Sequence, residues 1–203
     1  MEDLNLSEYQ KDALKEIGTI CAGNAATALS QLLDKQITIV VPRILFLPIE
    51  DVPQAVGGDD KLVVGLVLRV LGDLPSTIVF IFGQHDALAL ASLMTGKEIS
   101  DKSVISELER SALKEVGVIL ANSYLGALGS FVGLGLVPRV PEVIIDMAGA
   151  IVDYILIELS CKSQFALLIE SEFKQPEESI TGHFFLIPDP SGFDLIINSI
   201  GKG

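Results

Sequence analysis

Apolar residues recur at three- and four-residue steps in two stretches of the chain, which predicts two amphipathic helices. The first stretch spans 12–33, and 111–132 repeats it at an offset of 99 residues with nine of 22 positions identical. A fixed offset of this kind indicates an internal repeat. Ser7 is a good N-cap residue, so we expect the first helix to begin beside it, and the second helix to span 107–132.

The segments that follow the two helices repeat one plan of strand, short helix, two strands and helix. In the first half these segments are 37–47, interrupted by Pro42, then 50–56, 62–71, 76–82 and 86–94. In the second half they are 140–147, which carries Pro141, then 148–156, 164–169, 181–187 and 192–200. A proline inside a strand marks an edge strand or a bulge, so Pro42 predicts an edge.

This plan predicts an α/β fold of the layered α+β kind, built as one domain over 1–203 from two repeats at about 8–96 and 104–201. The strands of the two repeats are expected to merge into one six-stranded mixed sheet. The two long helices are expected to pack on that sheet.

One face of each long helix is predicted to point away from the core, because each residue turns about 100° around the helix axis. The residues on these faces are Asp12, Glu16, Thr19 and Gly23 in the first helix and Ser111, Glu115, Val118 and Asn122 in the second. A solvated outer face is the ordinary explanation of acidic residues opposite an apolar stripe.

Charge and targeting signals narrow the class of partner. The chain has 14 Lys and Arg against 27 Asp and Glu, a formal net charge of −13, which opposes binding to nucleic acid and to anionic lipid. Cys21 and Cys161 lack disulfide or metal spacing, and the N-terminus lacks a signal peptide. The apolar runs are too short to cross a bilayer. We therefore expect a cytoplasmic protein without membrane insertion that binds proteins or small ligands.

The sequence lacks the patterns of a self-sufficient enzyme. His85 and His183 are the two histidines, and neither has a paired nucleophile near it in sequence. Phosphate-binding loops, dinucleotide fingerprints and zinc spacings are missing too, so we expect no cofactor or metal of the protein's own. This suits an accessory protein that acts on the active site of a partner.

Both repeats carry the same spaced pattern. In the first, Asp12 is followed by Glu16, then by Thr19 and, 23 residues further, by Pro42; the second has Ser111, Glu115, Val118 and Pro141. The pattern resembles the signature of the CheC/CheX/FliY family of chemotaxis phosphatases, which reads Asp or Ser, three residues, Glu, two residues, Asn, twenty-two residues, Pro. The stretch 16–30, EIGTICAGNAATALS, resembles the CheC form. The resemblance covers nearly the whole chain and implies a pseudo-twofold fold.

The resemblance implies that the substrate is the aspartyl phosphate of the response regulator CheY, which holds Mg²⁺ and a lysine at that site. Glu16 would pair with this lysine, and the amide at position 19 would orient the attacking water. Thr19 and Val118 replace the Asn of the family. We therefore predict a first site with weakened hydrolysis and a second site that is inactive, although Glu115 is still able to dock a regulator, with Asp12 and Ser111 beside the two docking faces.

Asn24 does not supply the missing amide, because it lies roughly 12 Å along the helix from Glu16.

Two other functions remain as alternatives to the phosphatase hypothesis. The chain is alternatively a non-catalytic adaptor for the receptor deamidase CheD, which by resemblance would dock on 143–154 with Asp146 at its entrance, unless that segment is ordinary core. A structural part of the flagellar switch, as in FliY, is less favoured because no switch domain follows residue 203.

Overall fold

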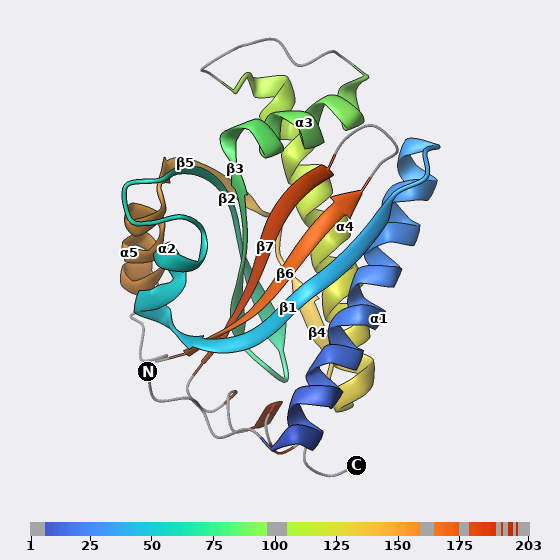
Figure 1. The fold of residues 1–203 in the computed structure, drawn as a ribbon, viewed down its shortest axis with the longest axis vertical. Helices are drawn as coiled ribbons and strands as arrows, with labels where there is room; N and C mark the ends of the chain where they lie inside the picture. The colour runs from blue at the N-terminus through green and yellow to red at the C-terminus, as the bar shows by residue number, and fades with distance from the viewer. Residues whose placement is uncertain are drawn as a thin grey trace.

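The computed structural model describes residues 7–96, 105–158, 165–174 and 179–189, together with 192, 195, 196 and 198. Within these residues a curled sheet is covered by helices on both faces (Figure 1). The elements of the first half are α1 (Glu8–Leu33), β1 (Thr38–Pro48), the 3₁₀ turn η1 (Ile49–Asp51), α2 (Val52–Ala55), β2 (Leu62–Gly72), β3 (Ser76–Gly83) and α3 (Gln84–Thr95). Those of the second half are α4 (Glu107–Val132), β4 (Leu136–Pro138), β5 (Glu142–Met147), α5 (Ala148–Glu158), β6 (Phe165–Lys174) and β7 (Ser179–Pro188).

Both long helices begin with the same capping box. The Gln10 backbone N–H donates to Ser7 Oγ and the Ser7 backbone N–H donates to Gln10 Oε1, at 3.3 and 2.9 Å. Ser106 and Glu109 exchange the equivalent pair of bonds at the start of α4. These bonds satisfy backbone donors that the first turn leaves unpaired, which confirms the predicted helix starts. Gly133, with a φ of 72°, ends α4 in the left-handed conformation.

The predicted six-stranded mixed sheet is wrong in both respects. Within the described ranges the sheet has seven strands, in the order β1-β6-β7-β3-β2-β4 with β5 also paired to β2, and every pair is antiparallel. The reason is that the hairpin β6–β7 inserts between β1 and β3, so strands of the two halves interleave. The three-residue β4 was missed because it is too short to show a period, and Pro141 precedes β5 instead of lying inside a strand.

The order of the strands is symmetric with respect to the two halves. Exchanging β1, β2 and β3 with β5, β6 and β7 reverses the order β1-β6-β7-β3-β2-β5 onto itself. Two repeats would produce this arrangement, and the division at about 8–96 and 104–201 stays a prediction.

The expected edge strand with Pro42 is confirmed, since β1 lies at one end of the sheet and its register shifts between Val40 and Arg43. Residues 97–104 between the two halves lie outside the described residues, as does most of the predicted helix at 192–200.

Alternate strand residues enter two separate cores. On one face of the sheet, Val64 and Phe80 belong to a large cluster with α1, α3 and α4. On the other face, Val63 and Val79 belong to a smaller cluster with α2 and α5. Successive side chains of a strand point to opposite faces, so the two-residue period sorts them between these cores.

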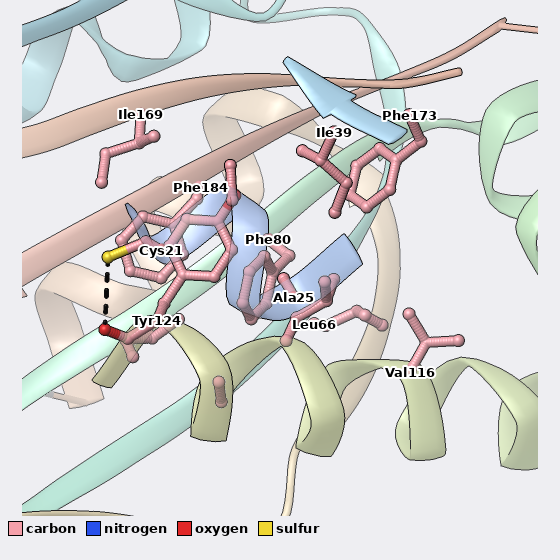
Figure 2. Packing of buried hydrophobic residues seen from close by; sticks show 14 of the residues in the cluster. Cys21, Ala25, Ile39, Leu66, Phe80, Val116, Tyr124, Ile169, Phe173 and Phe184 are labelled. Atoms are coloured by element: carbon pink, nitrogen blue, oxygen red, sulfur yellow. Dashed lines mark hydrogen bonds between the residues drawn. The ribbon is translucent and has the colours of Figure 1, made fainter. Parts of the chain in front are cut away.

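The helices α1 and α4 lie side by side and run antiparallel on the larger core (Figure 1). Figure 2 shows where they meet: the Cys21 thiol donates to the backbone oxygen of Tyr124 at 3.5 Å. The Tyr124 ring stacks on Phe184 with 4.6 Å between centroids, and its hydroxyl shares a hydrogen bond of 2.7 Å with Ser171. This buried contact fixes the two helices against each other and against β6 and β7.

The helix α4 is apolar enough to meet a simple test for a membrane span. Its most apolar window has a mean hydropathy of 1.3, and half of that window is buried inside the protein. Leu113, Leu120 and Leu125 are among its buried residues and pack in the larger cluster. In this structure α4 therefore packs as a core helix.

Candidate functional site

The outer face of α1 presents the first set of predicted residues. Asp12, Glu16 and Thr19 are exposed, whereas Leu14 and Ile17 are buried on the side that meets the core. Helical spacing predicted this separation. Glu16 and Thr19 are three residues apart, so their Cα atoms lie about 4.5 Å apart along the axis and the two side chains share one face.

The hydroxyl of Thr19 is engaged within its own helix. Thr19 Oγ1 donates to the backbone oxygen of Lys15 at 2.8 Å. Its proton is thereby directed along the helix, and an outside water finds only the acceptor side of the oxygen. A short, β-branched side chain in this conformation has neither the reach nor the two donors of the Asn amide.

The outer face of α4 presents the second set with a different chemistry. Ser111 and Glu115 are exposed, and Val118 is half-buried and offers no polar atom. Asn122 does not replace it, because its amide Nδ2 donates to the backbone oxygen of Val118 at 2.8 Å. Beside this face lies an open groove of about 630 Å³, lined by Glu107, Arg110, Ser111, Lys114, Glu142 and Val143.

The two glutamates have no ion-pair partner in the part of the chain that the structure describes. The ion pairs found there are Lys11 with Glu8, Arg43 with Glu170 and Lys174 with Glu172. Glu16 and Glu115 are therefore exposed carboxylates on capped helices, available to a cation from another molecule. The unpaired and rigidly placed acid is what docking onto a lysine requires.

The two faces form separate sites. Because α1 and α4 are antiparallel and meet at Cys21 and Tyr124, Glu16 and Glu115 lie toward opposite ends of the pair. Counted from that contact at 1.5 Å per residue, they are roughly 21 Å apart along the helices. The two glutamates therefore lie on separate parts of the surface and do not share one small site.

A glycine two residues after each glutamate lets the following part of the chain approach the site helix closely. At Gly117 an added Cβ would lie 2.9 Å from Cγ of Pro141, which is buried beneath α4, and at Gly18 it would collide with Ile44 of β1. Sequence reasoning missed this role, although the repeated Glu-x-Gly was a signal for it. The contact also explains Pro141 of the spaced pattern, because its rigid ring supports the helix turn below Val118.

The segment proposed for CheD is core on one side only. Ile151, Val152 and Ile155 of α5 are buried, whereas Met147 and Ile157 are 51% and 76% exposed. Asp146 is exposed where α5 begins, and its Oδ1 accepts a hydrogen bond of 2.8 Å from the Met147 backbone N–H. The outer side of α5 thus carries Ile157 together with the exposed polar groups of Asp153 and Tyr154, and Asp146 and Met147 lie at its entrance.

The ionisable groups with shifted pKa values lie away from both faces. Burial raises the pKa of the Cys21 thiol to about 12. Burial also holds the pKa of His183 below its ordinary value, against the opposing effect of Glu170. Among the described residues, no three His, Cys, Asp or Glu side chains gather as metal ligands would.

Comparison with known proteins fits this geometry. The CheC-like family model matches residues 10–45. The chain is 34% identical over 200 residues to the CheY-P phosphatase CheC of Bacillus subtilis, a match that covers 97% of this chain and 96% of that protein.

Two solved structures share the fold. Thermotoga maritima FliY matches with a TM-score of 0.76 and 20% identity, covering 98% of this chain and 99% of that one. A chain of the CheX–CheY–BeF3–Mg²⁺ complex from Borrelia burgdorferi matches with a TM-score of 0.50 and 19% identity, covering 87% and 97%. With a relative this similar over nearly its full length, and with the spaced pattern present in both halves, the chain belongs to the CheC-like family.

Proposed function

We propose that this protein docks on the phosphorylated form of a CheY-type response regulator and promotes hydrolysis of its aspartyl phosphate at a reduced rate. The observation that carries the proposal is the pair of exposed carboxylates, Glu16 and Glu115, each on a capped helix and without an ion-pair partner in the described ranges. The relative named CheY-P phosphatase CheC supplies the class of substrate.

In this proposal the protein contributes by positioning groups at the phosphorylated site of the regulator. Glu16 pairs with the lysine of the regulator and sets the orientation of α1 over the phosphorylated pocket, with Asp12 one turn away at the rim. The Mg²⁺ and the phosphoryl group belong to the regulator. Phosphoryl transfer depends mainly on alignment and on electrostatic stabilisation, so a side chain that holds the attacking water in line is the remaining contribution.

The two sites differ in that contribution. Thr19 offers water an acceptor only, because its proton is directed to Lys15. Val118 offers nothing, so the face with Ser111 and Glu115 holds a regulator without hydrolysing its phosphate. The protein therefore acts as a slow phosphatase with one weak site and one docking site.

Phosphate release from a regulator charged with acetyl phosphate tests this proposal. Glu16→Ala is expected to abolish the stimulated release, and Glu115→Ala to leave it while halving the number of regulator molecules bound at saturation. Glu50→Ala, which removes an exposed carboxylate from η1, is the matched control and changes neither quantity. Loss of release in Glu115→Ala with full release in Glu16→Ala would reverse the ranking of the two sites.

A second function is favoured by the exposed side of α5, where Ile157 lies on the same helix as the exposed Asp153 and Tyr154. We propose that this surface, with Asp146 at its entrance, binds the deamidase CheD, independently of the α1 and α4 faces. Co-purification with CheD should be lost in Asp146→Lys and kept in Glu16→Ala. Regulator binding should show the opposite pattern, and a variant Asp146→Lys that still retains CheD would exclude this surface.

A further inference from the structure

A pocket on the face of the sheet opposite α1 and α4 has no part in the proposed phosphatase function. It has a volume of about 570 Å³ and lies between β2 and β3, the segment 138–142 and α5. Pockets that hold small organic ligands have volumes of roughly 300–1,000 Å³. Its apolar wall is formed by Val67, Pro138, Val140 and Ile155.

Two arginines line this pocket, and they lie side by side. The Arg139 backbone N–H donates to the backbone oxygen of Arg69 at 2.8 Å. Neither guanidinium forms an ion pair with a carboxylate of the described residues, although the chain has 27 acidic residues and only 14 basic ones. Both arginine side chains are exposed, so their charge is available at the pocket to an anion from outside.

A buried hydroxyl completes the polar part of the pocket. Thr77 lies opposite Arg69 in the pairing of β2 and β3, so the two side chains share a face of the sheet. Thr77 is 2% exposed, and its Oγ1 has no hydrogen-bond partner among the described residues. A buried hydroxyl without a partner is unfavourable and is usually explained by a missing ligand, ion or water.

The acidic group at the pocket is hydrogen-bonded to a neighbour and keeps its charge. Glu142 Oε2 accepts a hydrogen bond of 3.2 Å from the Tyr154 hydroxyl. Two arginines and one glutamate leave a formal charge of +1 on the lining. The guanidinium fork matches the oxygens of a carboxylate or a phosphate, and the apolar wall requires a ligand with an apolar body.

We propose that this pocket binds a small organic anion, a carboxylate or a phosphate monoester attached to an apolar group. Arg69 and Arg139 hold the charged end, the Thr77 hydroxyl bonds one of its oxygens, and the apolar wall covers the body. The site is separate from Glu16 and Glu115, so it does not depend on the proposed phosphatase function.

Isothermal titration calorimetry on the full chain tests the proposal with four probes. 1-Naphthyl phosphate and 1-naphthoate should each bind one molecule per chain. Inorganic phosphate, which lacks the apolar body, and 1-naphthalenemethanol, which lacks the charge, should bind at least about tenfold more weakly. The relative affinity of the two naphthyl anions shows which oxyanion the site prefers.

Variants locate the binding. The double variant Arg69→Gln with Arg139→Gln should weaken both naphthyl anions at least about tenfold. Arg43→Gln, which removes one positive charge from the edge strand β1, should leave their affinity unchanged. Thr77→Val should weaken them several-fold and yet raise the thermal midpoint of the unliganded protein, because it removes the unpaired hydroxyl. A hydroxyl with a purely structural role would change the midpoint alone.

Three results would overturn the proposal. They are the absence of saturable one-to-one binding to the native protein, an equal loss of affinity in Arg43→Gln and the double variant, and unchanged affinity in Thr77→Val. If an acidic segment of a partner protein is the natural occupant, the naphthyl anions bind no better than inorganic phosphate, which also contradicts the small-ligand assignment.

Discussion

Replacing Thr19 by Asn should restore the water-positioning group that both sites lack. The side chain at position 19 is exposed on α1, so an amide there meets no neighbouring element, and Thr and Asn have similar helix propensities. The change breaks the bond from Thr19 Oγ1 to the Lys15 oxygen and substitutes a longer arm with two donors and an acceptor. The fold should therefore be unaffected while the chemistry changes.

The expected gain in rate equals the value of the hydrogen bond to the attacking water that the Thr19 hydroxyl does not supply. A single well-placed hydrogen bond to the reacting group is worth about 10²–10³ in rate, or roughly 2.7–4 kcal/mol of the activation barrier. Position 19 lies about 4.5 Å along the axis from Glu16, close enough for one helix turn to dock the regulator and hold the water together. We therefore expect Thr19→Asn to raise the stimulated rate of phosphate release by about 10²-fold or more.

Stopped-flow or single-turnover phosphate release at saturating protein measures this rate without the binding step. Thr19→Ser is the matched control, because it removes the β-branch without adding an amide, and it should stay near the native rate. Regulator affinity should be nearly equal in all three proteins. A Thr19→Asn protein no faster than the native one, or a Thr19→Ser protein that gains as much, would refute the assignment of water positioning to this residue.

Three further predictions concern packing and pH. Gly117→Ala should lower the free energy of unfolding by about 1–2 kcal/mol, because the added Cβ would overpack against the Pro141 ring below α4. Gly126→Ala, on the open side of the same helix, should raise it by about 1 kcal/mol, because Ala favours the helix over Gly. Urea unfolding measures both values. Tyr124→Phe should cost about 1–3 kcal/mol because it leaves the Ser171 hydroxyl buried and unpaired, and adding Ser171→Ala should recover part of that loss. Burial lowers the pKa of His183 in the folded state, so as the pH falls the unfolded chain takes up this proton before the folded chain does. The stability contribution of His183 should therefore be greatest above pH 6.5 and decline as the pH falls toward the lower pKa of the folded state. His183→Gln should flatten that decline. An unchanged slope in His183→Gln would assign the decline to other groups.

Much of the local structure of this protein is determined by the sequence alone. The apolar period of 3.6 residues locates α1 and α4, and Ser7 and Ser106 begin them, because a capping side chain and a periodic stripe act within a few residues. The same arithmetic places Glu16 and Glu115 on the solvent side. The hairpin of β2 and β3 and the edge position of Pro42 also follow from local signals, namely a tight turn and a missing backbone donor.

Only the tertiary structure decided how distant segments meet. Inserting β6 and β7 between β1 and β3 depends on which strand faces bury against which helices, a choice between surfaces that lie more than a hundred residues apart in the chain. The inserted hairpin pairs antiparallel with both of its neighbours. The meeting of β2, β3, α5 and the segment 138–142 likewise creates the arginine pocket, whose residues share no spacing in the sequence. Periodicity reports which side of an element is apolar, but long-range packing selects the neighbour that covers it.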